Sequence, residues 1–212
     1  MGRGPGWNRD GFIQAAATGA TNLAMLPALL KAWRLGLYYE MVIGFMTMAT
    51  SAAYHTCESL NYEFLGFNEG RWHHMDNVFA ILSFMAIFSQ FSPHHREPRV
   101  RETANAVSTS VAVVAQLMSP WQVEYTVAPI VAALVYVMLS IAVARKAPRV
   151  DGSAGLRALL TFFCAVTCFV KGLDEAHDTL RLWHGGWHLS VGAFSFYVLD
   201  ASHPPEEKVH PQ

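Results

Sequence analysis

Charged side chains are scarce in this sequence. They make up 15% of its 212 residues, whereas an ordinary soluble domain contains about 25%. The two signs nearly cancel, because 15 Lys and Arg stand against 16 Asp and Glu, for a formal net charge of −1. This composition excludes a disordered chain, a coiled coil and a highly charged nucleic-acid binder. We therefore expect no nucleic acid among the partners of this protein.

Cysteine is scarce as well. The chain contains Cys57, Cys164 and Cys168, and an odd count of three does not predict a disulfide framework. The last two lie within an apolar run, where small buried thiols are the ordinary interpretation. The sequence thus gives no sign of a small, disulfide-held secreted fold.

Apolar residues, in contrast, are abundant at 52%, and they fall into long runs. We find seven runs of about 16–23 residues, close to the roughly 20 that a helix needs to cross a bilayer. They are Gly11–Trp33, Tyr38–Cys57, Met75–Phe91, Thr103–Met118, Glu124–Ala144, Gly155–Gly172 and, approximately, Leu182–Leu199. The first run shows no cleavage site and predicts a retained helix rather than a signal peptide. The sequence predicts an all-α, seven-transmembrane helix bundle over residues 1–200 and a disordered cytosolic tail over residues 201–212.

The distribution of Lys and Arg predicts the orientation of this bundle. Five lie on the N-terminal side of the predicted membrane: Arg3, Arg9, Arg71, Lys171 and Arg181. Ten lie on the other side: Lys31, Arg34, Arg96, Arg99, Arg101, Arg145, Lys146, Arg149, Arg157 and Lys208. The positive-inside rule then places the N-terminus outside or in a lumen and the C-terminus in the cytosol. We expect a multi-pass protein of the plasma membrane or an endomembrane, with a homodimer as one possible assembly. Gly19, Gly36 and Gly44 allow close helix contacts, but nothing in the sequence identifies a dimer face.

Five polar residues stand at the ends of predicted spans on the same side of the membrane. Ser51 and His55 share one helix face near the end of the second run, Asp76 begins the third, and His184 and His188 begin the seventh one turn apart. Ionisable residues inside membrane spans are costly and commonly functional. Three histidines are a common catalytic zinc set, with a fourth position left for water. We therefore predict a Zn²⁺ site with His55, His184 and His188 as ligands, and Asp76 and Ser51 as assisting catalytic residues.

Each of these residues also has a structural interpretation when it is taken alone. His55 could be a hydrogen-bonding group between helices, Ser51 a small packing residue, and Asp76 a helix cap. A pair of histidines four residues apart is common in proteins. The combination of Ser-x3-His, Asp and His-x3-His on one side of a seven-span chain is far more specific than its parts. The polar stretch around His177 is expected to be a solvated loop.

These residues resemble a known group of membrane proteins. The Ser51-x3-His55, Asp76 and His184-x3-His188 pattern across seven spans is similar to the CREST superfamily of membrane hydrolases and receptors. The Tyr54–Ser59 and Trp72–Asn77 stretches look most like its myomaker-like (DUF3522-type) branch. The resemblance implies a zinc ion held by the three histidines, with the Ser and Asp close by, and hydrolysis of an amide or ester bond in a lipid. The acidic N-terminal pattern of alkaline ceramidases and the C-terminal cysteines of vertebrate myomaker are absent, which disfavours ceramide hydrolysis and muscle-type fusion.

Three functions are consistent with this pattern. The leading one is a zinc-dependent hydrolase that cuts the acyl ester or amide bond of a membrane lipid. The alternative is a non-enzymatic membrane-remodelling or receptor-like protein, in which zinc only joins the second and seventh spans. A third is a haem-binding electron carrier with His55 and either His184 or His188 as axial ligands, although Ser51 and Asp76 have no place in that scheme.

Overall fold

The computed structural model describes residues 9–95, 97–119, 121–174 and 176–203, and this part of the chain is built of helices. No β-sheet forms among these residues; the one extended pairing is a bridge between Phe64 and Phe67. The helices are α1 (Arg9–Thr18), the 3₁₀ helix η1 (Ala20–Met25), α2 (Leu26–Arg34), α3 (Tyr38–Leu60), α4 (Glu69–Ser89), α5 (Pro98–Met118), α6 (Val123–Ala144), α7 (Gly152–Gly172) and α8 (Leu182–Ser202). The predicted all-α class is confirmed, while the predicted tail lies largely outside the described residues.

Local sequence signals set several helix boundaries. The side chain of Asn68 caps α4 by accepting a hydrogen bond from the backbone N–H of Arg71 at 3.1 Å. Asp151 caps α7 in the same way, from the N–H of Ala154 at 2.7 Å. These contacts satisfy backbone donors that the first helical turn leaves unpaired. Asn61 ends α3 in the left-handed conformation (φ 48°), which asparagine tolerates better than most residues.

The first apolar run is one candidate membrane span, Arg9–Arg34, but it is not one continuous α-helix. The 3₁₀ segment η1 interrupts it between α1 and α2. Pro27 stands in the first turn of α2, where its missing N–H breaks the hydrogen-bond ladder to the preceding turn. Asn22 and Thr21 donate side-chain hydrogen bonds back to Thr18 O and Ala17 O, at 2.8 and 2.7 Å. This break exposes backbone carbonyls inside the bundle.

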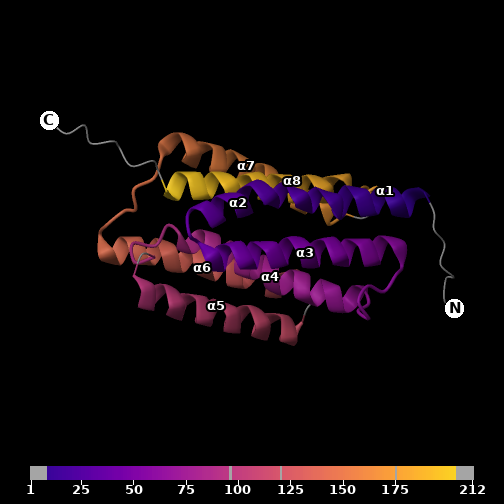
Figure 1. The fold of residues 1–212 in the computed structure, drawn as a ribbon, viewed down its shortest axis with the longest axis horizontal. Helices are drawn as coiled ribbons and strands as arrows, with labels where there is room; N and C mark the ends of the chain where they lie inside the picture. Colours follow the sequence, from indigo (N-terminus) through magenta and orange to yellow (C-terminus); the bar gives the residue numbers. More distant parts are fainter. Residues whose placement is uncertain (1–8, 96, 120, 175, 204–212) are drawn as a thin grey trace.

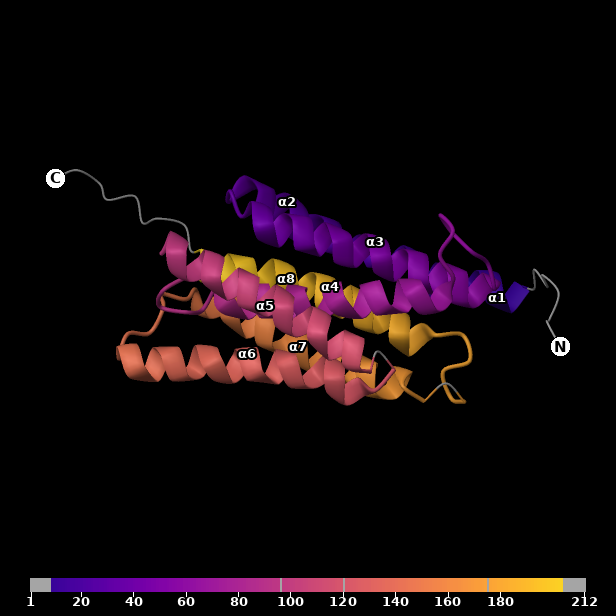
Figure 2. The same cartoon turned by 90° about the horizontal axis from the view of Figure 1, so that it is seen from below.

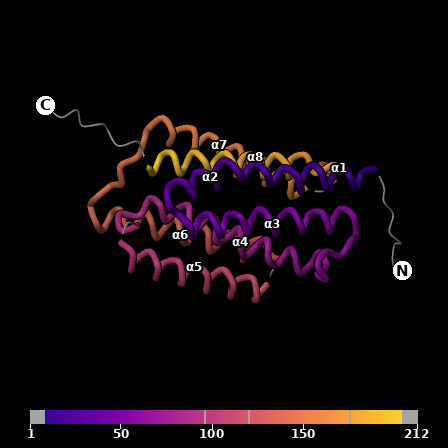
Figure 3. Tube along the Cα trace, viewed as in Figure 1, coloured from indigo at the N-terminus to yellow at the C-terminus, as the bar shows by residue number. Residues whose placement is uncertain are grey.

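The helices run roughly parallel to the long axis of the molecule in two layers. Helices α1, α2, α7 and α8 form one layer, and α3, α4, α5 and α6 form the other (Figure 1). Figure 2 shows α2 and α3 along one edge and α6 along the other, with α4 and α8 between them. The chain path in Figure 3 begins its described part at one end of the bundle and ends α8 at the other. Buried aromatic residues Phe84, Phe88 and Phe194 join α4 to α8 between the layers.

Three segments are long and apolar enough to cross a membrane: Arg9–Arg34, Val123–Ala144 and Gly152–Gly172. This finding indicates a membrane protein. The most apolar of them, α6, has only 11% of its window buried, as expected for a helix that faces lipid. The inner helices α3 and α4 carry polar groups that the bundle itself surrounds, which lowers their hydropathy. The seven predicted spans are therefore not all recovered by length and composition.

The predicted starts of two spans lie several residues after the observed starts of their helices. Helix α4 starts at Glu69 and not at Met75, because the Asn68 cap precedes a polar first turn that hydropathy alone does not detect. Helix α5 starts at Pro98 and not at Thr103, since proline is well suited to the first helical turn. In both cases the helix extends beyond its apolar part.

Candidate metal centre

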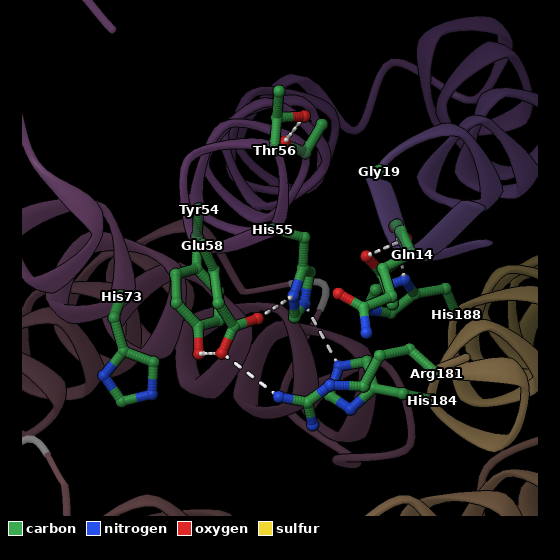
Figure 4. Close-up of polar contacts among 12 residues, drawn as sticks. Gln14, Gly19, Tyr54, His55, Thr56, Glu58, His73, Arg181, His184 and His188 are labelled. Carbon is green, nitrogen blue, oxygen red and sulfur yellow. Dashed lines mark hydrogen bonds and ion pairs between the residues drawn. The ribbon is translucent and has the colours of Figure 1, made fainter. Parts of the chain in front are cut away.

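Three histidine side chains meet between the two layers of the bundle. His55 comes from the C-terminal third of α3, and His184 and His188 come from the first two turns of α8 (Figure 4). One ligand atom from each lies within 4.8 Å of the other two. The Nε2 atoms of His55 and His184 are 3.1 Å apart. The three histidines are therefore close enough to hold one metal ion.

The two glycines between the α8 histidines allow this helix to approach α1 closely. A Cβ atom at Gly185 would lie 2.2 Å from the carbonyl oxygen of Ala17, far inside van der Waals contact. One at Gly186 would lie 3.1 Å from Cys168 Sγ on α7. The absence of side chains at these positions lets α8 fit between α1 and α7 with both histidines turned toward α3.

A backbone carbonyl in the break of the first run orients His188. The Nδ1 atom of this residue, which is 7% exposed, donates to Thr18 O at 2.9 Å. Because a carbonyl can only accept, the proton is on Nδ1, and Nε2 keeps its lone pair. The amide of Asn22 donates to the same carbonyl at 2.8 Å. The interrupted helix thus supplies a group that a regular helix would have used internally.

The carboxylate of Glu58 orients the ring of His55. Its Nδ1 atom lies 3.3 Å from Glu58 Oε2, one turn further along α3. The other oxygen of Glu58 accepts hydrogen bonds from the Tyr54 hydroxyl at 2.9 Å and from Arg181 Nη2 at 3.2 Å (Figure 4). This arrangement places the proton of His55 on Nδ1 and leaves the Nε2 lone pair directed at the other histidines.

The start of α8 is held by an acid that was expected in a solvated loop. Asp178 is only 4% exposed, and its two oxygens accept from the backbone N–H groups of Trp183 and His184, both at 3.1 Å. It therefore fixes the turn from which His184 projects. His177, in the same loop, is exposed as expected, and its hydrogen bond lowers the pKa of Asp174 below the usual range.

Ser51 and Asp76 lie together beside the histidines. Ser51 is 4% exposed and stands one turn before His55 on α3. Its hydroxyl interacts with the Asp76 carboxyl, which projects from the second turn of α4 and lies close enough to Glu58 and Tyr54 to interact electrostatically with both. Because Asn68 caps α4, Asp76 is not the cap of its helix. The structure thus brings all five predicted residues to one region.

Sequence reasoning did not identify the residues that orient the histidines. Glu58 follows His55 by three positions, a spacing that places it on the same helix face and could have indicated it. Asn22 and the Thr18 carbonyl act from an element more than 160 positions away in the chain, and a carbonyl has no sequence signature. Arg181 reaches Glu58 from the loop before α8.

The donor set fits a transition metal of the zinc type. Two of the three imidazoles have their outer ring nitrogen bound to an oxygen acceptor, which is the usual arrangement of metal-bound histidine. Two nitrogens on a tetrahedral zinc ion lie about 3.3 Å apart, given Zn–N bonds of about 2.0–2.1 Å, which is near the 3.1 Å observed between His55 and His184. The rings of His55, His184 and His188 have centroids 4.6–5.1 Å apart, which leaves no room for a porphyrin between them.

The fold and the site together define a class: an all-α membrane protein with a buried three-histidine centre between its helical layers. A family model described as "Protein of unknown function (DUF3522)" matches residues 10–189. The chain belongs to this family, and the matched range contains all three histidines. None of the curated proteins matches the chain.

Proposed function

We propose that this protein is an integral membrane hydrolase of the CREST type, myomaker-like branch, that uses zinc to cut the acyl ester or amide bond of a lipid. The observation that carries this proposal is the convergence of three histidine nitrogens beside a serine–aspartate pair. A metal site that only joins helices has no need of a carboxyl group held next to it. A water-activating site does need one.

The histidines, Asp76 and Ser51 have separate roles in the proposed reaction. His55, His184 and His188 would hold zinc, which supplies a Lewis acid that polarises a carbonyl and makes water more acidic. Asp76 would accept the proton of the attacking water and pass it to the leaving alcohol or amine. Ser51 orients the carboxyl group. The acyl C–O or C–N bond breaks, and the water oxygen remains on the released fatty acid.

The membrane arrangement brings the lipid to this site. We place seven helical segments across the bilayer, with α1, η1 and α2 together forming the first. The N-terminus then lies outside or in a lumen, and the C-terminus lies in the cytosol. In support, the described part of the chain starts and ends at opposite ends of the bundle (Figure 1). The histidines then lie in the outer or lumenal leaflet, within reach of the linkage of a lipid whose acyl chain remains among the helices.

The first test measures metal content. The full chain is purified in mild detergent and analysed by elemental mass spectrometry, beside His55→Ala, His188→Ala and the control His94→Ala, whose residue lies in an exposed loop. We expect about one zinc per chain in the wild type and in the control, and none in the other two variants. No zinc in folded wild-type protein would contradict the proposal.

A second candidate function is a structural zinc in a non-enzymatic membrane-remodelling or receptor-like protein. The observation that favours it is the burial of the centre, because His55 and His188 are 3% and 7% exposed. Turnover separates the two functions. Release of fatty acid from a panel of acyl esters and amides, lost on chelation and restored by zinc, supports the hydrolase, whereas retained zinc without turnover supports the structural role.

A further inference from the structure

A small cavity lies inside the bundle at the end opposite to the histidines. Its volume is about 30 Å³, and helices α2, α3, α4 and α8 contribute to its wall, which includes Glu40, Ser83, Gln90 and Ser195. A cavity of this volume has room for a small occupant such as a water molecule. Glu40 and His55 are fifteen positions apart on α3, or about 22 Å along the helix. The cavity is thus separate from the candidate metal centre.

Gln90, which lines this cavity, has a buried amide oxygen without a partner among the described residues. The side chain of Gln90 is 1% exposed. Its Nε2 donates to Glu40 Oε1 at 2.9 Å and to Ala86 O at 3.3 Å. The Ala86 carbonyl can only accept, so the amide nitrogen of Gln90, and not its oxygen, faces this carbonyl. Its Oε1 atom has no hydrogen-bond partner in the structure, and a buried acceptor without a partner is costly.

The other polar groups of the wall also offer lone pairs. Ser195 donates its proton to Val191 O at 2.9 Å. Ser83 shares a 2.7 Å hydrogen bond with Thr47, whose own hydroxyl can donate to either Ile43 O or Phe79 O, both at 2.9 Å. The hydroxyl protons are therefore used in hydrogen bonds within α8 and between α3 and α4, and the oxygens remain as acceptors.

The Glu40 carboxyl group takes part in none of the ion pairs found among the described residues. On α2, Lys31 pairs with Asp200 and lies 4.9 Å from the centre of the Phe196 ring. An occupant that brings positive charge would satisfy both the carboxylate and the unpartnered amide oxygen. An ion in direct contact with these oxygens would have lost at least part of its hydration shell.

We propose that the cavity binds one dehydrated sodium ion, held by Glu40 and Gln90 Oε1 with the hydroxyl oxygens of Ser83 and Ser195 beside them. Oxygen ligands are those that hard cations prefer. A single carboxylate neutralises one positive charge, which selects a monovalent ion over Ca²⁺ or Mg²⁺. The ion would join α3 to α4 at the end of the bundle that lacks the histidines.

The test is the thermal unfolding of the full chain in detergent, titrated with NaCl against choline chloride at constant ionic strength. A ligand that binds only the native state raises Tm in a saturable way. At ten times its Kd, the expected rise for a protein of this size is about 3–5 °C. Choline should have no such effect. An equal rise with choline, or with K⁺, would overturn the assignment of sodium.

Two variants and one control complete the test. Glu40→Gln removes the charge, and Gln90→Met removes the amide oxygen while keeping the shape of the side chain. Both should lose the sodium-dependent rise, and their far-UV circular dichroism and zinc content should stay at wild-type values. The exposed control Glu63→Gln should keep the rise. A rise that persists in both cavity variants would mean that the cavity holds water only, and the proposal would be wrong.

Discussion

At the end of the bundle where α8 begins, three histidines converge, and at the opposite end Glu40 and Gln90 border a small cavity. Both ends bury polar side chains in an apolar bundle. At both ends, most of the polar N–H and O–H groups donate hydrogen bonds to acceptors within the protein. His188 donates to Thr18 O, and Gln90 donates to Glu40. What remains differs: nitrogen lone pairs at one end and oxygen lone pairs at the other. Nitrogen ligands suit zinc, whereas oxygen ligands suit hard cations.

The largest expected effect tests whether the histidine end does chemistry. Asp76→Asn keeps the size of the side chain but cannot accept a proton from water. We expect lipid hydrolysis to fall by about 10²–10⁴-fold while the zinc content stays at the wild-type level. The exposed variant Asp10→Asn serves as the control and should remain active. Full activity in Asp76→Asn would remove this residue from the mechanism.

The second largest expected effect tests the close packing of α8 against α1 at Gly185. Gly185→Ala places a methyl group 2.2 Å from the Ala17 carbonyl oxygen, so the backbone must move. Overpacking of this kind costs about 1–3 kcal/mol or more, and the shift should also weaken zinc binding. Denaturant unfolding and a zinc titration measure both. The matched change Gly155→Ala meets only an ordinary contact, with Val150 Cγ1 at 3.4 Å, and should leave both quantities near wild type.

The role of Glu58 predicts a graded loss of metal affinity. Removing the partner of a metal-bound histidine costs about 10–100-fold in affinity. We expect this loss in Glu58→Met, which removes both oxygens, and a smaller one in Glu58→Gln, which can still accept from His55. Tyr54→Phe removes only one hydrogen bond to Glu58 and should change affinity least. The same affinity in all three variants would mean that His55 is held by packing alone.

The smallest effect concerns Asn22, in the break of the first run. Asn22→Leu removes the amide donor to Thr18 O, but His188 still donates to that carbonyl. We expect a loss of about 0.5–1.5 kcal/mol in the free energy of unfolding and little change in zinc affinity. A large loss of zinc would show that the amide, and not the carbonyl alone, determines the position of His188.

The sequence predicted the helical class well, because long apolar runs have few other stable conformations. It placed helix starts less well where the first turn is polar, as at Glu69. It also indicated Gly19 and Gly44 as positions that allow close packing, and both pack closely within the chain. A Cβ at Gly19 would lie 2.5 Å from Ala15 O, and one at Gly44 would lie 2.7 Å from Leu29 Cδ2.

By itself, the sequence determined that the chain forms long apolar helices and that Ser51, His55, Asp76, His184 and His188 stand near their ends. Spacing along one helix is enough for this, since residues four apart share a face. Only the tertiary structure decided which groups orient His188 and which residues line the cavity beside Gln90. Those contacts join elements far apart in the chain, and the one that orients His188 uses the Thr18 carbonyl, which lies at the break of the first apolar run.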